Sequence, residues 1–130
     1  MSKLTVFLAR LLGLFTILIV ACLAFRGSAM VEAAVANQPV MLTYGMISLA
    51  IGLAMVLGHN VWSGGVLGVV VTLVGWLILA KGLLLLLLAP ESLVQLYAKM
   101  QHGDNLYLYL PSFVIGLYLT FAGFAVRLRD

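Results

Sequence analysis

The chain has 130 residues, of which 65% are hydrophobic and only 8% are charged, and its formal net charge is +3. Soluble domains carry about 25% charged and about 45–50% apolar residues. A water-soluble fold of this length would bury only roughly 60–70% of the surface that its unfolded chain exposes, which is too little to hide so much apolar surface. The composition therefore excludes an ordinary soluble domain and favours a single transmembrane domain over residues 1–130.

The seven Lys and Arg residues are scattered along the chain and form no basic cluster. We interpret them as anchors at helix ends that face lipid headgroups, and we expect the lipid bilayer as a partner and no nucleic acid. The single cysteine, Cys22, has no partner for an internal disulfide and behaves as a small hydrophobe within an apolar run.

The first apolar run covers residues 4–25, with Arg10 as its only charge. A run of about 20 residues at 1.5 Å per residue crosses the ~30 Å hydrocarbon core of a bilayer. The start at Lys3 also resembles a signal peptide, and the Ile-Val-Ala-Cys sequence of residues 19–22 resembles a bacterial lipoprotein cleavage site. The length of the run favours a first transmembrane span over either alternative.

Three further apolar runs predict spans over residues 40–57, 66–89 and 105–126. The glycine-rich link at residues 58–65 is so short that the second and third spans should be antiparallel neighbours. No run has the alternating pattern of a membrane β-strand. In the fourth span we expect a kink at Pro111, because proline lacks the N–H that pairs with the carbonyl four residues earlier. The sequence thus predicts an all-α bundle of four transmembrane helices.

Two segments between spans read as short interfacial helices. Residues 29–36, after the first span, are small and mildly polar, and residues 90–102, after the third, are amphipathic. Four side chains of the second segment share one helical face at i, i+3, i+4 and i+7: Leu93, Leu96, Tyr97 and Met100. Pro90 suits the first position of that helix, which is too short to cross a membrane and should lie in its surface.

The order of span, surface helix and span therefore occurs twice. Residues 48–53 (Ser-Leu-Ala-Ile-Gly-Leu) align with residues 112–117 (Ser-Phe-Val-Ile-Gly-Leu) at an offset of 64 residues. Two spans per unit would make the repeats parallel, related by an axis along the membrane normal. Duplication of one helical hairpin and chance similarity between Leu-rich segments both remain open.

Glycines recur at seven-residue spacing inside three of the predicted spans: Gly45, Gly52, Gly68, Gly75, Gly82, Gly116 and Gly123. Seven residues are close to two helical turns, so each set forms a stripe along its helix. Small residues let membrane helices approach closely. We expect these stripes to pack helices of this chain together, or one of them to face another subunit.

Lys81 lies about 12 Å before the break at Pro90, inside the third span. Charges within a membrane are rare and suggest a functional role by default. The simpler interpretation is that the long side chain reaches the membrane surface. The alternative is a role towards a substrate, a proton or a partner.

His59, Asn60 and Trp62 lie in the link between the second and third spans. Trp prefers the membrane surface, and His and Asn can bond free backbone groups at helix ends. The other histidine, His102, falls on the opposite side in the predicted topology, so we expect no metal site. We also expect no cofactor and no catalytic residues.

The predicted topology puts both termini on the side of the middle link. That side holds Lys3, Arg127 and Arg129, whereas the other side holds Arg26 and Lys99. The small excess favours cytoplasmic termini.

Residues 57–62 (Leu-Gly-His-Asn-Val-Trp) and 71–77 (Val-Thr-Leu-Val-Gly-Trp-Leu) are followed by Lys81-Gly82 and Pro90. This pattern resembles a family of small bacterial inner-membrane proteins with four spans. The resemblance implies a bacterial inner membrane and gives weight to His59, Asn60, Trp62 and Lys81, but it supplies no mechanism.

The sequence therefore predicts a non-enzymatic membrane protein: an accessory or structural subunit of a membrane complex, or a small homo-oligomer. Its protein partners would be other membrane subunits or further copies of itself. The alternative is a small transporter or channel component in which Lys81 and the Pro111 kink, with Tyr109 or Tyr118, line a polar path.

Overall fold

The computed structural model describes residues 2–100 and 106–126, and within these ranges the chain forms helices and no strands. The helices are α1 (Lys3–Arg26), α2 (Ser28–Val35), α3 (Gln38–Gly58), α4 (Val66–Leu87), α5 (Pro90–Met100) and α6 (Leu106–Ala125). The all-α prediction is confirmed, and each predicted helix has a counterpart within a few residues.

Local capping sets the starts of the long helices. The Ser2 side chain accepts a hydrogen bond from the backbone N–H of Thr5 at the start of α1, and the Asn37 side chain accepts one from Val40 at the start of α3. Such caps satisfy backbone donors that have no partner within the helix. Gly27 separates α1 from α2 with a φ of 75°, a conformation that glycine adopts at little cost.

The predicted end of the third span was two residues too late. The helix stops at Leu87 rather than residue 89, and Leu88 is extended with a ψ of 141°. The residue before a proline disfavours the helical conformation, so the chain has to leave the helix before Pro90. Residues 101 and 102 of the predicted interfacial helix, and Asn105 of the fourth span, lie outside the described residues.

Among the described residues, α1, α3 and α4 are long and apolar enough to cross a membrane. The fourth predicted span corresponds to a shorter apolar helix over Tyr109–Ala125, which is part of α6. Helix α6 runs through Pro111 rather than beginning at it.

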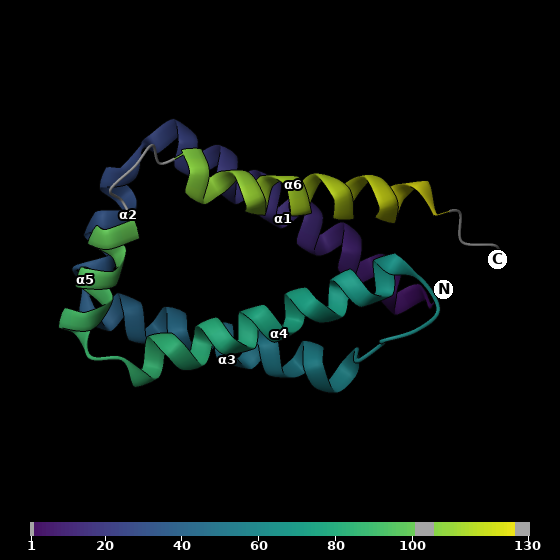
Figure 1. Ribbon diagram of the computed structural model, residues 1–130, viewed down its shortest axis with the longest axis horizontal. Helices are drawn as coiled ribbons and strands as arrows, with labels where there is room; N and C mark the ends of the chain where they lie inside the picture. Colours follow the sequence, from purple (N-terminus) through teal and green to yellow (C-terminus); the bar gives the residue numbers. More distant parts are fainter. Residues whose placement is uncertain (1, 101–105, 127–130) are drawn as a thin grey trace.

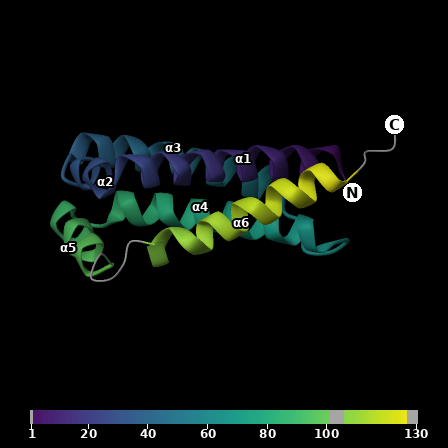
Figure 2. The same cartoon turned by 90° about the horizontal axis from the view of Figure 1, so that it is seen from above.

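The four long helices form two antiparallel pairs, α3 with α4 and α1 with α6 (Figures 1 and 2). The pairs approach one another at the end of the molecule where α1 begins and α6 ends, and they separate towards the other end (Figure 1). There α2 and α5 contact each other and run across the bundle. Exchanging α1, α2 and α3 for α4, α5 and α6 reproduces the same pairing.

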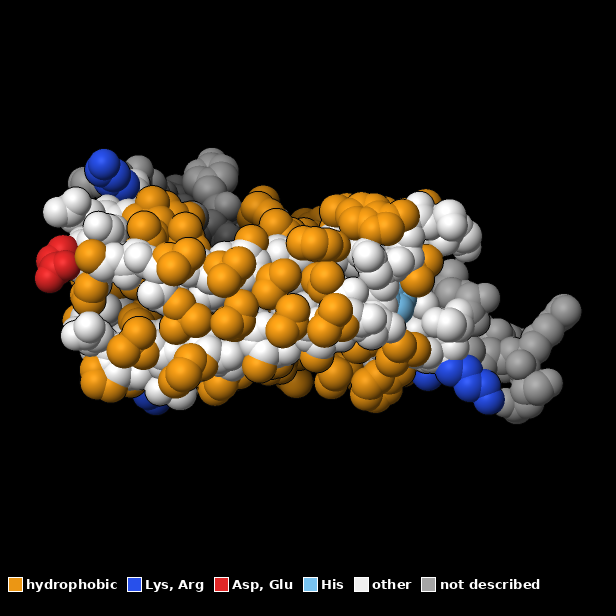
Figure 3. All heavy atoms as spheres, turned by 90° about the horizontal axis from the view of Figure 1, so that it is seen from below, with side chains coloured by type: hydrophobic (Ala, Val, Ile, Leu, Met, Phe, Trp, Pro, Cys, Tyr) orange, Lys and Arg blue, Asp and Glu red, His pale blue; other side chains and the backbone are white. Residues whose placement is uncertain are grey.

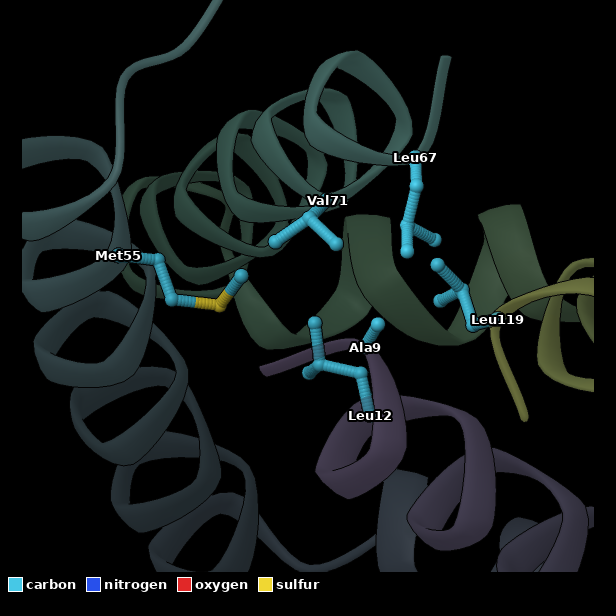
Figure 4. Close-up of a cluster of buried hydrophobic side chains, with 6 residues drawn as sticks. All are labelled: Ala9, Leu12, Met55, Leu67, Val71 and Leu119. Atoms are coloured by element: carbon cyan, nitrogen blue, oxygen red, sulfur yellow. The ribbon is translucent and has the colours of Figure 1, made fainter. Parts of the chain in front are cut away.

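The buried core joins the two pairs near their common end. It contains apolar side chains from all four long helices: Ala9, Leu12, Met55, Leu67, Val71 and Leu119 (Figure 4). On the face shown in Figure 3, apolar side chains cover most of the length and charged side chains lie near the two ends. The chain therefore buries little of its apolar surface by its own packing.

Candidate functional site

Two of the buried polar side chains, Thr5 and Thr72, contact a third, His59, which lies directly after α3. His59 is 3% exposed, and its Nε2 lies 2.8 Å from the Thr5 hydroxyl of α1. Its Nδ1 lies 3.3 Å from the Thr72 hydroxyl of α4. Thr5 and Thr72 are as deeply buried as the imidazole. One side chain thus connects α1, the α3–α4 link and α4 at the end where the helix pairs meet.

The hydrogen-bond partners of Thr72 determine which ring nitrogen of His59 carries the proton. The Thr72 hydroxyl accepts a hydrogen bond of 3.0 Å from the Val61 N–H, and its oxygen lies 3.1 Å from the Val61 carbonyl and 3.0 Å from the Gly68 carbonyl. A hydroxyl has a single proton. If Thr72 donated that proton to His59, both carbonyl oxygens would face lone pairs of the Thr72 oxygen, so the hydroxyl donates to one of the carbonyls instead. For an imidazole with one N–H, we therefore assign the proton to Nδ1 of His59, which donates to Thr72.

With that assignment, the remaining contacts form a continuous chain. The Thr5 hydroxyl donates to Nε2 of His59 and accepts from the Ser2 hydroxyl, 2.7 Å away. The Ser2 oxygen in turn accepts from the Thr5 N–H at 3.1 Å. Every buried side-chain nitrogen and oxygen among the described residues has a partner. This hydrogen-bonded cluster of Ser2, Thr5, His59 and Thr72 links α1 to α4, and we call it the His59 joint.

The other two residues predicted in the link, Asn60 and Trp62, lie outside this joint. The Trp62 indole N–H donates to the Asn60 side-chain oxygen at 2.6 Å, and both side chains are exposed. Gly64 and Gly65 complete the turn with φ values of 90° and 144°, which residues with a Cβ rarely adopt. The structure therefore separates His59 from its two sequence neighbours.

Lys81 is exposed, and its ammonium donates to the Tyr44 hydroxyl at 2.7 Å while lying 4.5 Å from the centroid of the tyrosine ring. Gly52 packs against Leu79, so the antiparallel register places Tyr44 near the level of Leu87. The Lys81 backbone lies six residues before Leu87, and is thus about 9 Å further than Tyr44 from the end of the bundle where α2 and α5 lie. Its side chain therefore extends towards the α2–α5 end.

Lys81 lines neither of two cavities that lie between the described helices. One, of about 220 Å³, is enclosed by residues of α2, α3, the end of α4 and α5. The other, of about 260 Å³, lies between α1 and α3 and includes His59 in its wall. Near the first cavity, in α5, burial raises the pKa of Tyr97 above its usual value, with smaller contributions from the charges of Tyr109 and Glu32.

Arg10 is a contact that the sequence did not predict. Its Nε donates to the Gly123 carbonyl at 2.9 Å, and the guanidinium carbon lies 4.8 Å from the centroid of the Phe124 ring. Gly123 is in the last turn of α6, where carbonyls lack partners within the helix and attract cations. Arg10 therefore fastens the end of α6 to α1.

We expect an Arg10→Met variant to lose about 1.5 kcal/mol of unfolding free energy, because a charge-assisted hydrogen bond disappears while the apolar part of the side chain is kept. Unfolding of both proteins in detergent with increasing dodecyl sulfate, followed by circular dichroism, measures the difference. Arg10→Lys retains the charge and serves as the control, with a smaller expected loss. Equal stability of Arg10→Met and the unaltered chain would contradict this role.

All seven glycines of the predicted stripes are buried. A Cβ on Gly52 would lie 2.5 Å from Cα of Leu79, and one on Gly82 would lie 2.5 Å from the backbone nitrogen of Leu49. The others also contact neighbouring parts of the chain: Gly45, Gly68, Gly75, Gly116 and Gly123. The stripes thus serve contacts within the chain.

The described residues include no group of three or more His, Cys, Asp or Glu side chains arranged to hold a metal ion. Comparisons of the chain with protein-family models, with curated proteins and with solved structures found no match. The described residues thus offer a buried hydrogen-bonded joint at one end, a lysine–tyrosine contact towards the other end, and two cavities lined mainly by apolar residues.

Proposed function

We propose that the chain is a four-span integral membrane protein without enzymatic activity, acting as an accessory or structural subunit or as a small homo-oligomer. One observation carries the proposal: only 22% of the residues in the apolar windows of α1, α3 and α4 are buried. The remaining apolar surface needs lipid or another membrane protein to cover it.

Two features support the four-span topology. Helix α6 has 20 residues, which corresponds to about 30 Å, and it packs along α1. Helices α2 and α5 run across the bundle at one end, as expected of helices in a membrane surface.

The packing also supports duplication of one helical hairpin. Three pairs of residues at the offset of 64 residues are buried in both halves: Gly52 with Gly116, Met55 with Leu119, and His59 with Gly123. The exchange of α1–α3 for α4–α6 that preserves the helix pairing corresponds to the parallel repeat expected for two spans per unit. The location in a bacterial inner membrane with cytoplasmic termini is part of the same proposal.

The alternative, transport along a polar path near Lys81, receives little support from the geometry. The lysine contacts Tyr44 on the exposed face of α3 and α4, and it borders neither cavity. This arrangement favours an anchor at the membrane surface over a position on a transport path.

Because the glycine stripes are occupied within the chain, a partner subunit would contact the outward apolar faces. We expect single cysteines at Leu77 in α4 or Phe121 in α6, 63% and 78% exposed, to give crosslinked dimers or partner adducts in native membranes. The exposed Cys22 is first replaced by Ser. Native mass spectrometry in mild detergent should show the same species. A strict monomer with no crosslink at either position and no co-purifying protein would refute the subunit role.

A further inference from the structure

The cavity between α1 and α3 has the shape of a groove. Leu4 and Leu8 line it on α1, and its wall on α3 extends from Ile51 to Gly58, a distance of about 10 Å along the helix. All of its side chains except His59 are apolar. It therefore runs parallel to the long helices, from the end where α1 begins and α3 ends towards the middle of the bundle.

The α1 side of this groove is next to a lysine. Lys3 is exposed and directly precedes Leu4, which lines the groove, whereas the Arg10 guanidinium is bound to Gly123 of α6. The acidic residues among those described, Glu32 and Glu91, belong to α2 and α5 at the opposite end of the molecule, where Arg26 and Lys99 also lie. The α1 side of the groove is thus next to the positive charge of Lys3 and distant from the described carboxylates.

We propose that this groove holds one acyl chain of an anionic phospholipid, whose headgroup phosphate pairs with Lys3. The inference rests on the proposed membrane location. A volume of about 260 Å³ exceeds the roughly 150 Å³ of an apolar cavity that binds benzene, so it accommodates a length of hydrocarbon chain. Basic residues at the membrane surface attract anionic lipids, at about 1 kcal/mol for each Lys or Arg.

The His59 joint makes the apolar lining possible. Both ring nitrogens are bonded to threonine hydroxyls, so the imidazole presents no unpaired polar atom to a hydrocarbon chain. The other cavity is less suitable for an anionic lipid, because Pro90 borders it and Glu91 follows directly.

Native mass spectrometry of the purified full chain tests the proposal with phosphatidylglycerol and phosphatidylcholine of identical chains. We expect the unaltered protein to bind phosphatidylglycerol about fivefold more tightly, the ratio that corresponds to one Lys contact. Lys3→Gln should remove this preference. Ala54→Phe, which fills the groove, should weaken binding of both lipids about tenfold, whereas Ala80→Phe on α4, away from both cavities, should leave it unchanged.

Several results would overturn the groove site: no headgroup preference in the unaltered protein, equal binding by the Ala54→Phe and Ala80→Phe variants, or competition by glycerol phosphate as effective as that by the whole lipid. If Ala54→Phe does not fold, the Lys3→Gln comparison decides alone. Alkaline extraction of reconstituted vesicles tests membrane integration separately. A protein that stays in the vesicles without a lipid preference contradicts the groove only, whereas a protein that is released contradicts the proposed function.

Discussion

A Gly52→Ala variant is expected to have a free energy of unfolding about 3 kcal/mol lower than that of the unaltered chain. The added Cβ would lie 2.5 Å from Cα and 2.8 Å from Cβ of Leu79, and these atoms belong to the α4 backbone or are attached to it. Side-chain rotation cannot relieve the overlap, so α3 and α4 have to separate. Overpacking of this kind typically costs about 1–3 kcal/mol, and the rigidity of two helix backbones puts this site at the upper end.

Gly58→Ala is the matched control, because Gly58 ends the same helix and a Cβ there would contact nothing within 4 Å. Both variants, purified in the same detergent, are unfolded with increasing dodecyl sulfate and followed by circular dichroism. We expect the Gly58→Ala transition to coincide with that of the unaltered chain or to move slightly to higher denaturant, since alanine favours helix. If Gly52→Ala matched this control, the close contact between α3 and α4 would be disproved.

The sequence predicted the helices well because the signals for them are local. Long apolar runs set the number and position of the long helices, and the spacing of Leu93, Leu96, Tyr97 and Met100 identified α5. The regular glycine spacing identified positions that turned out to be buried at helix contacts. Each of these properties is encoded within some twenty consecutive residues.

Contacts between distant segments were not predictable in the same way. Thr5 meets His59 across 54 residues, and Arg10 meets Gly123 across 113. A single sequence does not reveal which distant residue a threonine or an arginine within an apolar run will contact. Gly13 escaped notice because the first span contains no second glycine to give a spacing, yet a Cβ there would lie 2.6 Å from the Thr120 backbone nitrogen.

The glycine contacts also alter the basis of the oligomer hypothesis. The sequence left two interpretations of the stripes open: packing within this chain, or one stripe facing another subunit. The structure uses the stripes of α3, α4 and α6 to bring together α3 with α4 and α1 with α6. An interface with another subunit would therefore have to use larger apolar side chains, such as those of Phe7, Phe15 and Phe121 on the outward faces.

Replacing His59 with Phe is the second change with a large expected effect, a loss of about 2 kcal/mol of unfolding free energy. Phenylalanine approximates the size of the ring but bonds neither hydroxyl, so Thr5 loses its buried acceptor and keeps only the part-buried contact with Ser2. Leaving a buried polar group without its partner costs about 1–3 kcal/mol. Thr72 keeps its bonds to Val61 and Gly68, so most of the loss should arise at Thr5.

A double-mutant cycle isolates the bond between Thr5 and His59. Thr5→Val, His59→Phe and the double variant are unfolded under identical conditions, and we expect the double variant to lose less than the sum of the two single losses, by about 0.6–1.7 kcal/mol. His59→Gln places an amide near the position of Nε2 and should recover part of this coupling, whereas His59→Asn, which reaches towards Thr72 instead, should recover less. Strict additivity of the two single losses would mean that the 2.8 Å contact does not join α1 to the link. In that case the apolar core and the contact between α2 and α5 would hold the two helix pairs together.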